Sequence, residues 1–398
     1  MHPEQTTVVI AGAGYAGLHV ALRLEATRGH KRANVILVDR HPYHQVTTEL
    51  PRVASGTRLA SAVRIPVDQR LTQRTRFVQA DVLGFDLPAQ HLLTSSGPLP
   101  YTRLVLTLGS QPNDYGIPGL AEHALNLYSS EDAEHVWAAV HSAVGLAVAE
   151  PDAGRRRDRL TVLVGGGGPT GVEIAGELAE ALPELAGSRG LPADLPRVVL
   201  IEARPTLLPG FSASAVARAR SILGDLGVAV RTDAAIAEAT AQGFRLQGGE
   251  MVPGGVLIWT GGLRAPDVVA RSSLPLTREG RVRVDRYLRA VDHPEIFVAG
   301  DLAAAIDPGT GRLLPPLAQI ALDEAESVVR NLQAEMDGRP PRPFAFHNKG
   351  VVLSVGPRRG LAEVAGLVFA GRLAHTLKDL IEWEYRESVQ HLHGWNPV

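Results

Sequence analysis

The stretch from Val8 to Gly17 constrains the fold more than any other part of the chain. Its sequence, Val-Val-Ile-Ala-Gly-Ala-Gly-Tyr-Ala-Gly, predicts a buried strand, a tight glycine turn and the first turn of a helix. Gly12 permits the turn, Gly14 lets a pyrophosphate approach the backbone, and Gly17 lets the helix pack closely on the strand. The free N–H groups at the start of that helix then favour a bound phosphate.

The strand predicted after this helix, Val35 to Val38, ends in Asp39. An acid about 20 residues past the glycine turn is typical of a residue that binds a nucleotide ribose. The motif taken alone has another interpretation, a glycine turn between core elements with Asp39 in a strand-end turn.

The same pattern occurs again in the middle of the chain. A buried strand leads into a second glycine turn at residues 165–171, with Gly166, Gly168 and Gly171 at the same spacing. A helix and another buried strand follow, and that strand ends in Glu202. Two complete units, each with its acid in place, predict two bound dinucleotides.

Composition excludes several classes of function. The chain of 398 residues has no cysteine, which rules out disulfides, thiolate metal ligands and cysteine nucleophiles. Its histidines are scattered without ligand spacing, so we predict no metal site. The formal net charge of −2 argues against a nucleic-acid partner. Without an export signal or about 18 consecutive apolar residues, we expect a cytoplasmic protein with no transmembrane helix.

The later sequence indicates further elements. We expect an exposed linker at residues 151–159, a strand at 296–299 followed by Gly300-Asp301, and a long helix that starts near Gln319. Strands are also predicted over residues 77–85, 346–355 and 362–364.

The last predicted helix, about Val368 to Val389, has an apolar stripe at helical spacing. The stripe consists of Phe369, Leu373, Leu377, Leu380, Ile381 and Tyr385. The charges of this helix are mixed and slightly acidic, whereas a helix lying on an anionic membrane is basic on its polar face. We therefore expect the stripe to pack on the protein or on a second subunit in a homodimer. Peripheral contact with the cytoplasmic face of a membrane is the alternative.

Together with both glycine turns, four motifs make the chain resemble the two-dinucleotide flavoprotein reductases, and most of all the type II NADH:quinone oxidoreductases. The motifs are Gly166 to Leu178, Ile258 to Gly262, Phe297 to Asp301 and Leu314 to Ala321. The resemblance, which runs from Thr7 to about Val364, implies an α/β chain with two Rossmann-like domains. The first would bind FAD, and the second, inserted in it, would bind NAD(P)H. A small C-terminal module ending in an amphipathic helix would follow.

The implied boundaries are residues 1–118 and 286–342 for the FAD domain, 119–285 for the NAD(P)H domain and 343–398 for the C-terminal module. The motifs and the resemblance assign to FAD the residues Gly12, Gly14, Tyr15, Ala16, Gly17, Asp39, Arg40, Thr107, Gly109, Gly300, Asp301, Ala318 and Gln319. They assign to NADH the residues Gly166, Gly168, Thr170, Gly171, Glu202 and Gly261. A carboxylate at Glu202 favours NADH over NADPH because it would repel a 2′-phosphate, although the nearby Arg204 could pair with one.

Two residues are candidates for catalysis. The resemblance implies that Glu173 relays a proton near the nicotinamide and the electron acceptor, whereas the helix dipole alone could explain an acid in that helical turn. Gln319 is predicted at a helix start, where negative charge on a reduced flavin ring would be stabilised, or it is simply a polar residue in that position. His44 is expected to be a polar loop residue, with acid–base chemistry as the alternative.

The resemblance implies an FAD-dependent NADH dehydrogenase that passes electrons to a quinone without pumping protons. The absence of cysteine excludes the disulfide reductases and sulfide:quinone reductases of this fold. The second glutamine that the family carries on the late helix is Asp323 here. Two alternatives therefore stay open: a soluble reductase that uses ferredoxin or another non-thiol acceptor, and a redox-sensing protein that binds flavin and NADH.

Overall fold

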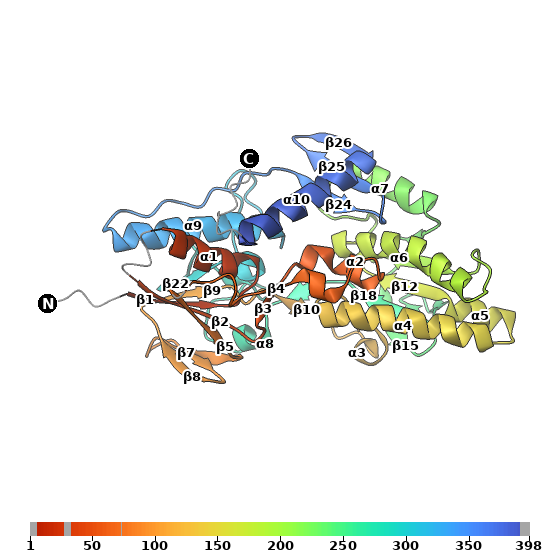
Figure 1. Cartoon of the computed structure of the whole chain (residues 1–398), viewed down its shortest axis with the longest axis horizontal. Coiled ribbons are helices and arrows are strands. Elements are labelled where there is room, and N and C mark those ends of the chain that lie inside the picture. Colours follow the sequence, from red (N-terminus) through yellow and green to blue (C-terminus); the bar gives the residue numbers. More distant parts are fainter. Residues whose placement is uncertain (1–5, 28–32, 73, 391–398) are drawn as a thin grey trace.

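The computed structural model describes residues 6–27, 33–72 and 74–390 (Figure 1). Its first layer is a six-stranded sheet in the order β21-β22-β9-β1-β2-β5, parallel except for β21. The strands are β1 (Thr6–Ala11), β2 (Ala33–Asp39), β5 (Thr75–Gln79), β9 (Arg103–Leu106), β21 (Arg289–Ala290) and β22 (His293–Val298). Strands from both ends of the chain therefore build one sheet.

Two helices cover one face of this sheet. Helix α1 (Tyr15–Ala26) packs against α9 (Ala318–Met336), although about 300 residues separate them in the sequence (Figure 1). Side chains of β1 alternate between the two faces of the sheet: Val8 and Ile10 belong to one core cluster and Val9 to another. All three are fully buried, so both faces of the sheet are covered. A small antiparallel sheet, β6 (Val82–Asp86), β7 (His91–Thr94) and β8 (Gly97–Pro100), lies beside it.

The second layer is a five-stranded parallel sheet in the order β11-β18-β12-β13-β14. Its strands are β11 (Leu125–Asn126), β12 (Thr161–Gly165), β13 (Arg197–Ile201), β14 (Ala229–Arg231) and β18 (Val256–Trp259). The accompanying helices are α4 (Ser130–Ala149), α6 (Pro169–Ser188) and α7 (Ala213–Asp225). A small antiparallel sheet follows, with β15 (Ile236–Thr240), β16 (Gly243–Leu246) and β17 (Met251–Pro253). The predicted α/β fold with two Rossmann-like sheets is confirmed.

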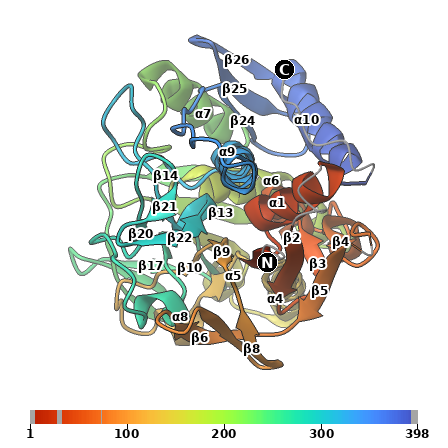
Figure 2. The same ribbon diagram turned by 90° about the vertical axis from the view of Figure 1, so that its left-hand side faces the viewer.

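The C-terminal part adds a three-stranded antiparallel sheet and a helix. The elements are β24 (Val351–Ser354), β25 (Gly360–Val364), β26 (Leu367–Gly371) and α10 (Arg372–Gln390). Helix α10 packs against all three strands, and α7 contacts β25 and β26 (Figure 2).

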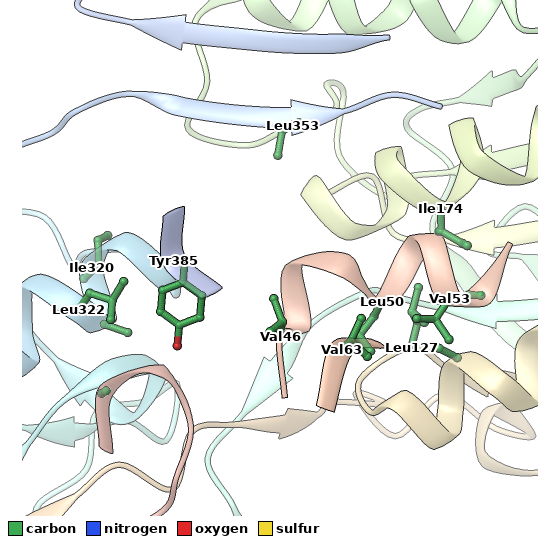
Figure 3. Close-up of a cluster of buried hydrophobic side chains, with 14 of the residues drawn as sticks. Val46, Leu50, Val53, Val63, Leu127, Ile174, Ile320, Leu322, Leu353 and Tyr385 are labelled. Atoms are coloured by element: carbon green, nitrogen blue, oxygen red, sulfur yellow. The ribbon is translucent and has the colours of Figure 1, made fainter. Parts of the chain in front are cut away.

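One hydrophobic cluster joins the parts of the molecule. Leu50 and Val53 of α2 (Leu50–Ala54) belong to it, together with Ile174 of α6, Leu353 of β24 and Tyr385 of α10 (Figure 3). The two nucleotide-binding units and the C-terminal helix therefore share a core.

Short elements connect these layers. The strands are β3 (Tyr43–Gln45), β4 (Arg64–Pro66), β10 (Gln111–Pro112), β19 (Leu263–Arg264), β20 (Val282–Arg283) and β23 (Ala303–Ala304). The helices are η2 (Thr47–Glu49), η3 (Ala60–Val63), α3 (Leu120–His123), α5 (Ala153–Arg159), α8 (Asp267–Ala270) and η4 (Gly300–Leu302). Within the described residues, no helix is long and apolar enough to cross a bilayer.

The predicted bounds of several elements were wrong. The strand predicted over 77–85 is two strands in different sheets, β5 and β6. The linker at 151–159 contains α5, because the Asp152 carboxylate caps the helix by accepting from Arg155 N at 2.8 Å.

The predictions near the C-terminus also need correction. Of residues 346–355, only Val351–Ser354 form a strand. The last helix begins at Arg372 rather than near Val368, because a turn at Ala365 and Gly366, both with positive φ, folds β26 back on β25 as a hairpin.

Candidate functional site

The two glycine turns are held by the same hydrogen bonds. In the first, Ala13 N donates to the Asp39 carboxylate at 2.6 Å. In the second, Gly167 N donates to the Glu202 carboxylate, also at 2.6 Å. Each acid therefore fixes the turn that precedes its own strand.

The remaining oxygen of each carboxylate is also oriented. The second oxygen of Asp39 accepts from His41 N at 2.8 Å, and that of Glu202 accepts from Arg204 N at 2.8 Å. Carboxylate oxygens can accept further hydrogen bonds, so both acids can still bind a ribose hydroxyl. Arg40, which follows Asp39, and Arg204, two residues after Glu202, are exposed.

The last glycine of each turn is required by close packing. A Cβ at Gly17 would overlap the carbonyl oxygen of Gly12, and a Cβ at Gly171 would overlap that of Gly166. Thr107 Oγ1 donates to the carbonyls of Ala11 and Gly12, each at 2.9 Å.

A threonine makes the equivalent hydrogen bonds in the second unit. Thr260 Oγ1 donates to Gly165 and Gly166, each at 3.1 Å. Thr260 was not predicted, although it lies in the Ile258 to Gly262 motif next to Gly261. A Cβ on Gly261 would overlap the Trp259 ring, so this position also requires glycine.

The middle glycine of each turn faces open space. A Cβ on Gly14 or Gly168 would meet no atom within 4 Å. Gly14 is the N-cap of α1 and Gly168 is the N-cap of α6, so backbone N–H groups of both helices point toward these spaces. Tyr15 and Ala16 begin α1, and Pro169 and Thr170 begin α6. The geometry fits a pyrophosphate in each unit.

The predicted flavin-end residues gather at the carboxyl edge of the first sheet. Asp301 follows β22 and accepts a hydrogen bond from Ser110 Oγ at 2.8 Å. Burial raises the pKa of the Asp301 carboxyl, although the Ser110 hydrogen bond and Arg281 oppose that shift. Gly109 and Gly300 both have positive φ, which allows the backbone to turn here.

A buried acid that the sequence did not reveal lies under this turn. Gly300 N donates to Glu324 Oε2 at 2.6 Å, and Glu324 is fully buried in α9. Burial raises the pKa of Glu324 to about 8, so it is largely protonated at neutral pH. Its other oxygen has no hydrogen-bond partner in the described part of the chain.

Ala318 and Gln319 form the first turn of α9, as predicted from the sequence. Gln319 is half-buried, and its Nε2 donates to the His347 carbonyl at 3.3 Å. Asp323 lies one turn further, and burial raises the pKa of its carboxyl against the opposing charges of Lys349 and His347.

Glu173 has a different environment from the one expected for an acid in a first helical turn. Because α6 begins at Pro169, Glu173 lies in the second turn, and it is buried. Glu173 Oε1 accepts from Ser354 N at 3.1 Å, from Ser354 Oγ at 3.3 Å and from Lys378 Nζ. The ion pair with Lys378, and not only the helix dipole, explains this buried carboxylate. In the described chain no hydrogen bond joins Glu173 to Gln319.

Lys378 connects three parts of the molecule. It lies on α10, pairs with Glu173 of α6 and places Nζ 3.5 Å from the carbonyl of Thr48 in η2. Burial disfavours its charge, but Glu173 and Glu382 outweigh that effect and raise its pKa. No local sequence pattern reveals this pairing, because 205 residues separate the two partners.

His44 is buried rather than exposed in a loop. Its Nδ1 donates to the Ala13 carbonyl at 3.0 Å, and its Nε2 accepts from the Tyr385 hydroxyl at 2.8 Å. Burial lowers the pKa of His44 to about 4, so the ring is neutral at pH 7. Tyr15 packs edge-on against the same ring. His44 and Tyr385 thus tie α10 to the first glycine turn.

The apolar stripe of the last helix was expected to be covered, and this chain covers it only in part: Tyr385 is buried and Leu377 is half-buried. Four large apolar side chains of α10 face outward: Leu373 (72% exposed), Leu380 (54%), Ile381 (37%) and Trp383 (58%). We call these four residues the outer face of α10. Of the predicted stripe, Tyr385 is buried, and Phe369 lies on β26.

Charged residues occupy the inner side of α10. Lys378 and Glu382 are buried, and Arg52 of α2 pairs with Asp379 at 2.6 Å and with Glu382 at 3.4 Å. Arg386 pairs with Glu49. The overall charge of the helix therefore does not describe its exposed surface, because most of these charges are paired with the protein.

Comparison with known proteins agrees with this geometry. Residues 6–325 match the pyridine nucleotide-disulphide oxidoreductase family. A type II NADH:quinone oxidoreductase of Staphylococcus aureus is 31% identical over 386 residues, which cover 96% of this chain and 95% of that protein.

Solved structures share the fold. NDH2 from Plasmodium falciparum, solved in complex with NADH, superposes with a TM-score of 0.85 at 16% identity, covering 98% of this chain and 97% of that one. The sulfide:quinone oxidoreductase of Aquifex aeolicus gives 0.80 at 18% identity, covering 98% and 92%. Since the bacterial relative aligns along nearly the whole of both chains, the chain belongs to the type II NADH:quinone oxidoreductases, within the pyridine nucleotide-disulphide oxidoreductase family.

Proposed function

We propose that this protein oxidises NADH through bound FAD and reduces a quinone, with the first glycine turn binding FAD and the second binding NADH. The observation that carries the proposal is the pair of equivalent glycine–acid units, together with the buried Glu173–Lys378 pair between the second unit and α10. The absence of cysteine separates the chain from the thiol-dependent reductases of the same fold.

FAD, when bound, would accept a hydride from NADH and pass the electrons to the acceptor. Asp39 would bind the adenosine ribose, Gly14 and the start of α1 the pyrophosphate, and Asp301 the ribityl or phosphate end. The N-terminus of α9, at Ala318 and Gln319, would stabilise negative charge near the ring. The domain division proposed from the sequence, with residues 119–285 inserted between 1–118 and 286–342, assigns one cofactor to each unit.

Glu173 and Lys378 are suited to supply a proton. Quinone reduction needs two electrons and two protons, of which the hydride carries both electrons and one proton. The second proton must come through the protein. Lys378 Nζ can donate a proton toward the acceptor and regain one from solvent, while the Glu173 carboxylate holds the ammonium group in position through the hydrogen bond at Oε1.

Glu202 determines the choice of nucleotide. We expect the kcat/KM for NADH to exceed that for NADPH, because a buried carboxylate would repel a 2′-phosphate. In Glu202→Gln the ratio of the two kcat/KM values should fall by roughly tenfold or more, as one charged hydrogen bond is lost. Steady-state constants for both nucleotides test this prediction.

The matched control is Asp39→Asn, the equivalent change in the first unit. Molecules of this variant that retain FAD should keep the wild-type nucleotide ratio. A wild-type preference for NADPH would remove the assignment of Glu202.

Anaerobic half-reactions test the proposed function. The purified protein should show a flavin spectrum, NADH should bleach it rapidly, and a short-chain quinone should restore it rapidly. Fast bleaching with slow recovery would favour a soluble reductase for another acceptor, or a sensor. No bound flavin, and none taken up from added FAD, would overturn the assignment of the first glycine turn.

We also propose that the outer face of α10 docks on a membrane surface, where a lipid-soluble quinone is available. Exposed leucine, isoleucine and tryptophan on one side of a helix are typical of helices that lie in the membrane interface. A homodimer through this face is the alternative. Light scattering decides between them, because a particle of 42.4 kDa leaves the outer face of α10 uncovered.

A further inference from the structure

The turn that leads to Asp301 rests on a buried acid to which the proposed function gives no role. A Cβ on Gly300 would lie 3.6 Å from the Ala16 Cβ and 3.7 Å from the Ala321 Cβ, so Gly300 is held between the first turns of α1 and α9. These two helices lie side by side (Figures 1 and 2). Gly300 N donates to Glu324 Oε2 at 2.6 Å, so the Glu324 carboxyl supports the turn from inside the protein.

This carboxyl has few partners for a negative charge. Glu324 is fully buried, and within the described residues its Oε1 has no hydrogen-bond partner. Glu49 is equally buried, but it lies between the guanidinium groups of Arg58 and Arg386. An ionised carboxylate in full burial needs such cations or several hydrogen bonds, so the environment of Glu324 favours the uncharged acid.

Arg281 does not neutralise Glu324, because its charge is shared with other acids. The charge of Arg281 favours ionisation of Glu324, but its guanidinium donates to the Leu314 carbonyl at 2.6 Å instead of to the carboxyl. The same charge acts on Asp301 and Glu279. An ionised Asp301 already balances Arg281, so ionisation of Glu324 would leave an excess negative charge in the protein interior.

The charged groups of the two helices do not help either. Asp323, next to Glu324 on α9, is another acid and opposes its ionisation. On α1, His19 and Arg23 face α9 but pair with Glu326. Burial, reinforced by Asp323, therefore raises the pKa of Glu324 to about 8.

FAD, bound as proposed above, would have its pyrophosphate at the start of α1, which Gly300 contacts. A negative charge at Glu324 would repel the phosphate charges across a medium of low dielectric constant. We propose that Glu324 is a positioning residue for FAD: its uncharged carboxyl holds the Gly300–Asp301 turn in place, and loss of its proton to solvent weakens binding of the cofactor. This inference rests on the proposed binding of FAD by the first glycine turn, and it adds a proton to that binding equilibrium.

Dilution of the FAD-loaded protein at a series of pH values tests the inference, because the fluorescence of released flavin gives the dissociation constant of FAD. If only the protonated form of Glu324 binds FAD well, this constant should rise about tenfold between about pH 7 and about pH 9. In Glu324→Gln the amide oxygen can still accept from Gly300 N, so the constant should stay near the wild-type value of about pH 7 over the whole range.

Glu177→Gln is the matched control, because Glu177 is also fully buried but lies on α6, with Ser55 and Thr57 as its donors. Its dissociation constant for FAD should keep the wild-type dependence on pH. A loss of this dependence in both variants would assign the effect to buried acids in general and overturn the role of Glu324.

The remaining outcomes separate this inference from the FAD binding on which it rests. A wild-type dissociation constant that does not change with pH would overturn the inference and leave FAD binding intact. The same rise in Glu324→Gln as in the wild type would assign the titration to another group, and loss of FAD from this variant at neutral pH would show that the turn requires the carboxylate. A protein that holds no FAD at any pH would overturn the proposed function itself.

Discussion

Gly17→Ala should give a protein that folds but retains little or no FAD. The new Cβ would overlap the Gly12 carbonyl oxygen and crowd Thr107 Oγ1, so the glycine turn must move away from α1. The backbone N–H groups that we propose bind the pyrophosphate would move with the turn. A displacement of about 1 Å in a binding constellation can lower function by about 100-fold. The flavin absorbance per protein, measured after purification and after adding FAD, reports the loss.

Gly171→Ala makes the same change in the second unit, with a different expected result. The Cβ would overlap the Gly166 carbonyl oxygen, so the protein should remain yellow but react poorly with NADH. The kcat/KM for NADH should fall by about 100-fold. The control is Gly187→Ala on the exposed side of α6, where a Cβ meets no atom within 4 Å. If Gly17→Ala kept its flavin, the first unit would not be the FAD site.

The second large effect concerns the buried pair of Glu173 and Lys378. Glu173→Gln should leave reduction by NADH fast and slow reoxidation by quinone by about 100-fold or more, in the range of a lost acid–base group. The amide keeps an oxygen that can accept from Ser354 N, so the variant should fold. Stopped-flow measurement of each half-reaction separates the two steps.

Glu177→Gln is the matched control, because Glu177 lies one turn further along α6 and is fully buried. Its carboxylate accepts from Ser55 Oγ at 3.3 Å and from Thr57 Oγ1 at 3.4 Å. Burial raises the pKa of Glu177 to about 7, so near neutral pH the amide removes only part of a charge and keeps the shape of the side chain. Its half-reactions should match the wild type, and wild-type reoxidation in Glu173→Gln would exclude the proton role of Glu173.

Lys378→Met tests the same pair from the other side. It would leave the Glu173 carboxylate buried without its cation, and removing one partner of a buried ion pair costs about 3–5 kcal/mol. We therefore expect a clear drop in melting temperature for this variant and a smaller one for Glu173→Gln, in which Lys378 keeps Glu382 as a counter-charge at 3.5 Å.

The nucleotide-binding units were predictable from the sequence because their determinants are local. A glycine turn must join a buried strand to a helix within a few residues, and Asp39 and Glu202 each end the next strand. The structure adds the hydrogen bonds of those acids to the turns, which explain why an acid is placed at each position.

The environment of α10 was not predictable, because its buried side chains are charged. Periodicity grouped Leu373, Leu380 and Ile381 correctly, but it could not reveal that this side faces outward while Tyr385 faces the protein. Lys378 and Glu382 are buried only because Glu173 and Arg52, far away in the sequence, provide opposite charges. Such pairings depend on the tertiary fold, and a single sequence carries no signal for them.

The thickness of α10 sets the distance between Lys378 and the outer face of this helix. Lys378 lies on the inner side, next to Glu173, while Leu380 and Trp383 lie on the outer side. A helix with its side chains is about 10–12 Å across. If the outer side rests on a bilayer, Lys378, the proposed proton donor, is held about one helix diameter from the lipid. The headgroup of a membrane quinone would then have to leave the lipid by about that distance to reach Lys378, while its tail can stay in the hydrocarbon.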